Sequence, residues 1–142
     1  MKEAITIGVD LAKNVFQVHS VDAAGAVVVR RQLRRGQVLP FFRKHPSCLV
    51  GMEACATSHH WGREITALGH EVKLMPPRYV KPYVKRNKND AADAEAICEA
   101  VTRPTMRFVD IKTPDQQSTL MVHRTRHLFI RQRTTLINAL RA

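Results

Sequence analysis

The sequence predicts an α/β domain in which a mixed β-sheet is flanked by helices and followed by a long C-terminal helix. Two observations carry this prediction. Near the N-terminus, β-rich runs follow one another with only short polar turns between them, as in a hairpin meander. Further along, apolar strands alternate with helical segments, which is the order of a parallel α/β arrangement. A sheet that begins with hairpins and continues with strand–helix alternation is mixed.

The first three strands are expected at residues 4–9, 14–21 and 26–33. Residues 4–9 are apolar on both faces, as in a central strand that is covered on both sides, and this strand ends at Asp10. The next two runs are rich in residues that favour strands, and residues 22–25 between them form a polar turn that contains glycine. These runs predict an antiparallel meander.

Strands and helices alternate in the middle of the chain. A short helix at residues 37–45 precedes an apolar strand at 48–52, which ends at Glu53. A helix at 58–68 then leads to a strand at 70–75, where two consecutive prolines stop it. Strands that alternate with helices in this way, after strands joined by hairpins, give an α/β domain with a mixed sheet.

The last part of the sequence predicts a helix from Asp90 to about Val101, a short strand at residues 106–111 and a long helix from Pro114. In the long helix, apolar residues recur at intervals of seven or eight, and arginines fill other positions with no acidic residue after Asp115. This pattern fits a helix that packs on a partner through one stripe and presents cations elsewhere. It reaches the last residue without a cap or a breaker, so we expect the helix to be truncated.

Composition bounds the class of protein. The 142 residues suffice for one domain with a real core, and their formal net charge is +11. Such a charge predicts an anionic partner, with nucleic acid as the first candidate and a membrane surface as the second. No apolar run approaches the roughly 20 residues that span a bilayer, and the N-terminus is not a signal peptide. We therefore expect a cytoplasmic protein that has no membrane partner.

The cysteines and one histidine pair are minor candidates. The three cysteines are odd in number and show no C-x-x-C spacing, so neither a disulfide framework nor a zinc site is indicated. We expect Cys55 and Cys98 to pack as small hydrophobic residues. His59 and His60 point about 100° apart on a helix, so at most one faces a given site. They are candidates for a DNA contact near Glu53 rather than for metal ligation.

Four carboxylates stand where the predicted fold would bring them together. Asp10 and Glu53 each end a strand, and if these strands are parallel neighbours both side chains project at one edge of the sheet. Asp90 and Asp93 are three residues apart, so they share one face of the helix that they open, with Cβ atoms about 5–6 Å apart. A solvated helix start would explain that pair alone. The conjunction of all four favours a common site.

Four ionised carboxylates cannot share a site unless protons or a cation reduce the repulsion between their charges. Each pair about 4 Å apart repels by about 4 kcal/mol at an effective dielectric constant near 20. Either some carboxylates take up protons or a divalent cation lies among them, and hard oxygen ligands select Mg²⁺ or Mn²⁺. Two such ions can activate a water or hydroxyl group and stabilise the leaving oxygen of a phosphodiester. The sequence therefore predicts Mg²⁺ (or Mn²⁺) as the cofactor.

A basic run precedes the Asp90 helix, with no acidic residue between positions 73 and 88. Tyr79 and Tyr83 are interleaved in it, which suits a nucleic-acid backbone and stacked bases, although a solvated loop is the alternative. The candidate nucleic-acid contacts are Lys13, Arg78, Lys81, Lys85, Arg86, Lys88, Arg124 and Arg126. The third strand ends in four further cations, which either contact phosphates or form an edge that resists strand addition: Arg30, Arg31, Arg34 and Arg35.

Three blocks of sequence resemble a known family. GVDLAK at 8–13, GMEACATSHHW at 51–61 and KNDAADA at 88–94 are similar to blocks of the DEDD-motif transposases of bacterial insertion sequences. These are the "IS one-ten" family and its sister group, related to the pilin-gene invertase. The resemblance covers nearly the whole chain. It implies an RNase H-like, RuvC-type catalytic domain over residues 1–112, and the start of a helical, coiled-coil or dimerisation region over 113–142.

The resemblance also implies a chemistry and partners. The family's four acidic residues fall on Asp10, Glu53, Asp90 and Asp93, with Mg²⁺ dependence and DNA strand cleavage and exchange. It implies a noncoding guide RNA, a homo-oligomer formed through the C-terminal helix, and a nucleoid-associated bacterial protein. Members carry a downstream domain with a serine nucleophile, and no serine here matches that motif. We therefore expect this fragment to be inactive alone.

Two other functions remain open from the sequence. One is a stand-alone nuclease of the Holliday-junction type, which would share the fold and the metal site but need no downstream domain. The other is a non-catalytic nucleic-acid-binding module whose carboxylates bind no metal. The length of the reading frame would separate the first from a transposase, and a Mn²⁺ titration would separate the second.

Overall fold

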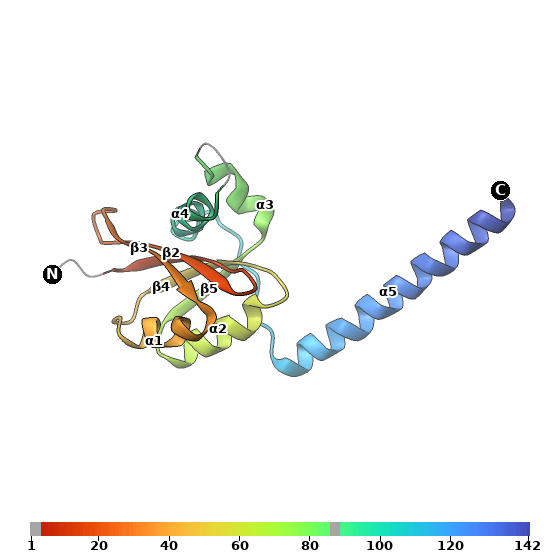
Figure 1. Ribbon diagram of the computed structural model, residues 1–142, viewed down its shortest axis with the longest axis horizontal. Coiled ribbons are helices and arrows are strands. Elements are labelled where there is room, and N and C mark those ends of the chain that lie inside the picture. Colours follow the sequence, from red (N-terminus) through yellow and green to blue (C-terminus); the bar gives the residue numbers. More distant parts are fainter. Residues whose placement is uncertain (1–3, 86–88) are drawn as a thin grey trace. The chain divides into compact units, whose positions relative to one another are not determined.

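The structure is a computed structural model that describes residues 4–85 and 89–142. The chain divides into two compact units, with the boundary between Ile111 and Lys112. The first unit contains a five-stranded sheet in the order β3-β2-β1-β4-β5 (Figure 1). The strands are β1 (Thr6–Asp10), β2 (Val15–Val21), β3 (Val27–Arg34), β4 (Leu49–Glu53) and β5 (Glu71–Met75).

The sheet is mixed, as the sequence predicts. β1 pairs with β2, and β2 with β3, in antiparallel fashion, whereas β1, β4 and β5 run parallel. The β2–β3 turn is closed by Asp22, whose carboxylate accepts hydrogen bonds from the backbone N–H groups of Ala24 and Ala26 at 3.0 and 2.9 Å. Gly25 in this turn has a φ of 77°, which a residue with a Cβ rarely adopts. The arrangement is consistent with the RNase H-like fold.

Helices cover the two faces of the sheet differently (Figure 1). The 3₁₀ turn η1 (Arg35–Gln37), α1 (Val38–Arg43) and α2 (Ser58–Ala67) belong to one side. The other side carries α4 (Asp90–Ala100), preceded by α3 (Pro77–Val80) and the 3₁₀ turn η2 (Lys81–Tyr83). We call these the α2 face and the α4 face. Two separate hydrophobic clusters correspond to them.

The α2 face carries a core of large side chains. Phe16 and Met52 are fully buried there, and Phe16 packs edge-to-face on Trp61 with ring centroids 5.2 Å apart. Trp61 and Ile65 are two of the buried residues on α2, and Leu74 from β5 lies in the same cluster. Burial of each such side chain contributes about 1.5–3 kcal/mol to folding. This face therefore supplies much of the stability of the sheet.

The α4 face is built on small residues. Gly8 of β1 and Gly51 of β4 are partners in the parallel register. A Cβ atom on Gly8 would overlap the Ala94 carbonyl oxygen and the Cys98 backbone nitrogen of α4. A Cβ on Gly51 would come within 2.8 Å of the Val101 Cβ. We call this glycine pair the glycine seat, because it lets the helix backbone lie directly on the strands.

Some expectations differ from the structure between β5 and α5. The basic run contains α3 and η2, in which Pro77 and Pro82 occupy early helical positions, where their fixed φ and missing N–H are tolerated. The strand expected at residues 106–111 is wrong. Only an isolated bridge pairs Val109 with Leu74. The neighbouring Arg107 and Asp110 stay exposed, so a longer strand would bury little.

The second unit is dominated by the predicted long helix, α5 (Pro114–Arg141), which has 28 residues. Thr113 caps its start, because the Thr113 hydroxyl accepts from the Gln116 N–H at 3.2 Å and the Gln116 side chain accepts from the Thr113 N–H at 3.0 Å. No residue of α5 is buried. No helix in the described part of the chain combines the length and hydropathy that a membrane span requires.

Candidate active site

Asp10 and Glu53 occupy equivalent positions at the carboxyl ends of neighbouring parallel strands. Val9 pairs with Met52, so the residues that follow them stand side by side at the end of β1 and β4. Alternate residues of a strand share a face, and the glycine seat lies two positions before each carboxylate. Both carboxylates therefore project from the α4 face, as the strand-end argument predicts.

The start of α4 places the second pair of carboxylates over this edge. Asn89 caps the helix, and its side-chain oxygen accepts a hydrogen bond from the Ala92 N–H at 2.8 Å. The Asp93 N–H donates to the Asn89 carbonyl oxygen at 3.0 Å and closes the first turn. Asp90 and Asp93 both lie in this turn, where the helix dipole favours negative charge.

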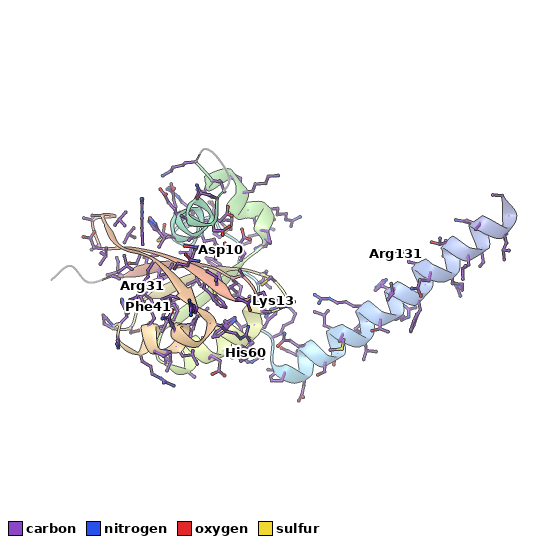
Figure 2. The ribbon with its side chains drawn as sticks, in the orientation of Figure 1. Asp10, Lys13, Arg31, Phe41, His60 and Arg131 are labelled. Atoms are coloured by element: carbon purple, nitrogen blue, oxygen red, sulfur yellow. The ribbon has the colours of Figure 1, made fainter. Side chains whose placement is uncertain are left out.

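Three of the four predicted carboxylates meet. Oxygen atoms of Asp10, Asp90 and Asp93 all lie within 4.8 Å of one another, and Asp10 lies between the sheet and α4 (Figure 2). Asp90 is exposed, and the other two are half-buried. At that distance each pair repels by about 3 kcal/mol at an effective dielectric constant near 20. A bound cation would relieve this repulsion.

The donor set fits a small hard cation. Ligands on opposite sides of Mg²⁺ stand about 4 Å apart, because each bond is about 2.1 Å long. Carboxylate oxygens within 4.8 Å of one another reach that geometry with small side-chain rotations. Glu53 is not one of the three that meet. It starts from the adjacent strand end, about 4.8 Å from β1 across the sheet, so its role in such a site stays a prediction.

Comparison with known proteins identifies the family. The model of a DEDD transposase family of the IS110 type, described as "Transposase", matches residues 7–142. The chain belongs to the IS110-type DEDD transposase family. It is 44% identical over 142 residues to the transposase for insertion sequence element IS1328 of Yersinia enterocolitica. It is 42% identical over 141 residues to the transposase for insertion sequence element IS1111A of Coxiella burnetii.

A further relative shows how much of such proteins the chain represents. This chain is 57% identical over 135 residues to a "Probable family 20 transposase" of Pseudomonas aeruginosa. The aligned region covers 95% of this chain and 40% of that protein. The Yersinia and Coxiella transposases are covered to 42% and 39% of their lengths, and they align with 100% and 99% of this chain. The chain thus spans about two fifths of these curated relatives.

In this chain, α4 is tied to its surroundings by ion pairs on its second and third turns. Glu95 lies 3.8 Å from both Arg30 of β3 and Lys85. Glu99 lies 3.2 Å from Lys85 and pairs with Arg103 at 2.6 Å. Burial alone would raise the pKa of Glu99, but the hydrogen bonds from Lys85 and Arg103 outweigh it and hold that pKa below its ordinary value. These pairs orient the helix that carries Asp90 and Asp93.

A buried histidine lies beneath the same helix. His19 pairs with Gly8 across β1 and β2, so it shares the α4 face, and only 4% of its surface is exposed. Burial lowers its pKa below 6.5; the charge of Glu95 opposes this shift, and Arg30 and Lys85 add to it. His19 is therefore a neutral packing residue near neutral pH rather than a cation. Nothing in the local sequence around His19 indicates this buried position.

The predicted nucleic-acid contacts of the first unit differ in their surroundings. Lys13 and Lys81 are exposed. Arg78 stacks 4.7 Å from the centroid of the Tyr79 ring and donates to its hydroxyl at 3.0 Å. Lys85 is engaged by the two glutamates of α4. The remaining two candidates lie outside the described residues: Arg86 and Lys88.

A pocket of about 290 Å³ opens beside Arg78 and Tyr79. Tyr83 and Arg107 line it as well, and Arg103 lies 5.6 Å from the centroid of the Tyr83 ring. Of the cations in the described part of the predicted basic run, only Arg78 lines this pocket together with the two tyrosines. That surface suits phosphates and bases.

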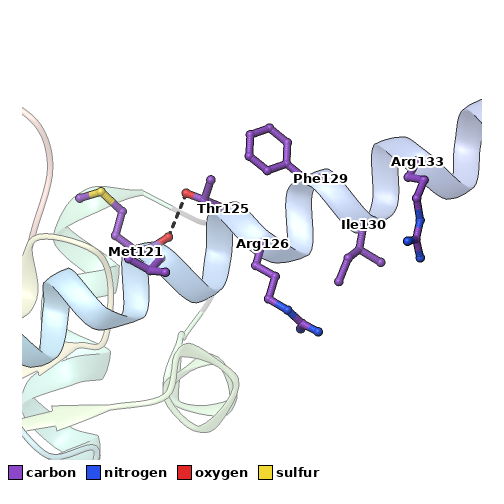
Figure 3. A pocket seen from close by; sticks show the side chains of 7 residues that line it. Met121, Thr125, Arg126, Phe129, Ile130 and Arg133 are labelled. Atoms are coloured by element: carbon purple, nitrogen blue, oxygen red, sulfur yellow. Dashed lines mark hydrogen bonds between the residues drawn. The ribbon is translucent and has the colours of Figure 1, made fainter.

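The predicted contacts in the second unit, Arg124 and Arg126, are exposed on α5. A shallow hollow of about 620 Å³ runs along this helix (Figure 3). All its lining residues come from the one helix, and the Thr125 hydroxyl within it donates to the Met121 carbonyl oxygen at 3.0 Å. It is therefore an open helix face with apolar residues such as Phe129, not an enclosed ligand site.

The histidine pair and the cysteines differ in burial. His59 is 7% exposed, whereas His60 is exposed with its ring centroid 5.1 Å from that of Trp61. Cys98 is buried, as predicted, and burial raises its pKa to about 11. The expectation that Cys55 packs internally is wrong, because it is exposed in the β4–α2 loop. Its backbone N–H faces the Ser58 hydroxyl at 3.0 Å, and Ser58 rather than Cys55 is buried.

Proposed function

We propose that this chain is the N-terminal catalytic domain of a DNA transposase or site-specific recombinase that cleaves and exchanges DNA strands at a divalent-metal site. The observation that carries the proposal is the meeting of Asp10, Asp90 and Asp93 at the carboxyl edge of a parallel strand pair. Family membership supports it, since the DEDD family model that matches residues 7–142 is described as "Transposase". Glu53 is the fourth ligand of the proposed site.

The residues of the site would act by binding and orienting. Asp10 and Glu53 project from rigid strand ends, and Asp90 and Asp93 close the site from a capped helix start. Mg²⁺ or Mn²⁺ held there would activate a water or hydroxyl nucleophile and stabilise the leaving oxygen of the phosphodiester. The four carboxylates would place the scissile phosphate so that the bond from the nucleophile to phosphorus forms as the bond to the leaving oxygen breaks, with the nucleophile giving its proton to solvent and the leaving oxygen taking one up.

Cations around the site would hold the DNA. Lys13 is exposed in the β1–β2 loop, three residues after Asp10, and suits a phosphate near the cleaved bond. The pocket beside Arg78, together with Lys81, suits a second segment of nucleic acid. In the second unit, the exposed Arg124 and Arg126 of α5 are further candidates for DNA contacts. We include Lys85, Arg86 and Lys88 as candidates from the sequence.

The whole protein would act as an assembly. We propose that α5 belongs to a helical region through which copies of the protein associate, because its large apolar residues such as Phe129 and Leu140 are exposed. A noncoding guide RNA, a downstream domain with a serine nucleophile and nucleoid association in a bacterium follow from the family resemblance. On this proposal the fragment alone is inactive in recombination.

Metal binding and strand cleavage test the proposal separately. In the full-length protein, Asp90→Asn and Asp93→Asn should each abolish Mg²⁺-dependent cleavage while circular dichroism shows an unchanged fold. Retained cleavage would reject the assignment. In the 142-residue chain, Mn²⁺ should bind saturably, and Asp10→Asn should remove that binding. Asp110→Asn, at an exposed position of the same unit, is the matched control and should bind Mn²⁺ as the unsubstituted chain does.

A further inference from the structure

The longest stretch of the chain without a carboxylate runs from β3 to β4. Between Asp22 and Glu53 there is no acidic residue, and six cations occur. In the described part of the chain only Arg30 among them forms an ion pair, with Glu95 of α4. The other five form no ion pair within the described residues, and they lie on β3, η1 and α1 or directly after α1: Arg31, Arg34, Arg35, Arg43 and Lys44.

Some of these cations border a groove. The groove lies between the edge strand β3 and α1, and its volume is about 330 Å³. Arg31 lines it from β3, while Lys44 and His45 line it from the end of α1. Leu33 and Phe41 form part of its apolar lining, and Figure 2 shows Arg31 and Phe41 on the α2 face. A groove with a cationic rim on both sides fits an elongated polyanion.

Arg35 connects this groove to the carboxylate edge. It begins η1, directly after β3, and its backbone N–H donates to the Asn14 carbonyl oxygen at 3.1 Å in the β1–β2 loop. Its guanidinium lies 5.1 Å from the centroid of the Trp61 ring, near the start of α2. That loop follows Asp10 and carries Lys13, which Figure 2 labels at the end of the sheet. Cations therefore lead from the groove to the carboxylates along the surface of one unit.

We propose that the groove, Arg35 and Lys13 form a track that holds the duplex DNA flanking the phosphodiester bond cleaved at the carboxylate site. The inference rests on the proposed function and names the path of its substrate. Arg31 and Arg35 are four strand residues apart, about 13 Å. That length corresponds to about four phosphates along one strand of duplex DNA.

The surface favours duplex DNA over a single strand. Single-strand sites stack bases on exposed aromatic rings, but Phe41 in the groove is only 7% exposed and Trp61 only 4%. The exposed cationic side chains can therefore contact the phosphate backbone, but neither of these rings is exposed enough for base stacking. Protection of the sheet edge against strand addition would account for Arg31. It would not account for Lys44, which follows α1, or for Arg35 over Trp61.

Salt dependence of binding tests the track. Binding of the 142-residue chain to a fluorescein-labelled DNA duplex is followed by anisotropy in EDTA, so that failure of metal chemistry does not affect this result. Each phosphate contact contributes about 0.9 to the slope of log affinity against log salt. Arg31→Ala/Lys44→Ala should lower the slope by about 2. An unchanged slope would overturn the proposal.

A charge-conserving variant separates the groove from net charge. Thr66→Arg/Ala67→Lys, added to the double variant, restores the two charges at the exposed end of α2, away from the carboxyl edge. The slope should stay low, and its recovery would overturn the proposal. An unlabelled single strand of the same sequence should compete less well than the duplex. Preferential competition by the single strand would overturn the assignment of duplex DNA.

A chemical probe locates the DNA directly. Gly36 lines the groove, and a Cβ there meets no atom within 4 Å. Iron–EDTA attached to Gly36→Cys in a Cys55→Ser background should cut the bound duplex, whereas the same group on Thr66→Cys should not. The other two thiols are buried, and burial raises the pKa of each to about 11, so they resist labelling. Equal cutting from both positions, or none from position 36, would refute the track.

Discussion

The two faces of the sheet are covered by helices in opposite ways. On the α2 face, large side chains such as Phe16 and Met52 separate helix from strand and are fully buried. On the α4 face, the glycine seat removes that layer: the helix backbone rests on β1 at Gly8, and the Val101 side chain packs directly on Gly51 of β4. The first arrangement favours stability, and the second fixes the distance between the helix and the sheet. A helix in contact with strand backbone cannot move closer without a clash or move away without opening a void. The carboxylates belong to the second face.

The largest effect on stability should come from removing a large side chain from the core of the α2 face. Phe16→Ala is expected to lower the free energy of unfolding by about 3–5 kcal/mol, because it leaves a cavity beside Trp61. Urea denaturation measures this loss. Mn²⁺ affinity at low urea, where the variant is still folded, should change little because the α4 face is untouched. A large fall in affinity there would mean that the two faces are not independent.

A methyl group in the glycine seat should have a smaller effect on stability and a larger one on the metal. Gly8→Ala drives a Cβ into the backbone of α4, which cannot move aside cheaply. We expect a loss of about 1–3 kcal/mol in stability from overpacking. Mn²⁺ affinity, measured by electron paramagnetic resonance, should fall about 10–100-fold, as for other residues that position ligands.

The matched control for this variant is Gly36→Ala, whose Cβ meets no atom within 4 Å and whose φ is not positive. It should leave both stability and Mn²⁺ affinity nearly unchanged. If Gly8→Ala lowered stability but kept full Mn²⁺ affinity, the seat would be structural only.

The other half of the seat allows a rescue experiment. A Cβ on Gly51 meets only the Val101 side chain, so Gly51→Ala should weaken Mn²⁺ binding less than Gly8→Ala. Adding Val101→Ala removes the two Val101 methyl carbons, which lie 3.0 and 3.1 Å from the new Cβ, but keeps the Val101 Cβ at 2.8 Å. It should therefore restore affinity in part, although it loses about 1.5 kcal/mol of burial. The test is a double-mutant cycle on Mn²⁺ affinity. Additive losses would argue against the clash as the cause.

The smallest effect should come from the buried histidine of the α4 face. Because burial lowers the pKa of His19, the unfolded chain binds more protons than the folded one at pH values below about 6.5. The stability that neutral His19 contributes is therefore complete above that pH and is lost as the pH falls below it. Thermal melts across this range should show a smaller pH dependence in His19→Gln. His60→Gln, at an exposed position, should keep the original dependence.

The sequence predicted the sheet and the edge where carboxylates gather, since strand ends and hairpin turns are local signals. The meeting of Asp10 with Asp90 and Asp93 followed from those signals once α4 was placed over the sheet. The distance of α4 from the sheet could not be predicted, because it depends on which strand residues face the helix. The requirement for glycine at position 8, two positions before Asp10, becomes evident only when α4 is seen to contact that strand.

The errors have the same origin. A strand was expected at residues 106–111 from local pattern, but strand formation there depends on partners along β5, and only Val109 finds one. Cys55 was expected to be buried from its residue type, yet the turn around the Ser58 hydroxyl leaves it outside. Long-range packing decides both cases.

The parallel register of β1 and β4 also has a consequence for folding. A slip of one residue in either strand would turn its terminal carboxylate from the helix side into the core of Phe16 and Met52, where an unpaired charge costs several kcal/mol. The pairing joins segments about 40 residues apart, so it closes a long loop and forms slowly. The carboxylates at the two strand ends therefore raise the free energy of mis-registered strand pairings during folding. On the proposed function, catalysis and correct folding would both depend on the same two side chains.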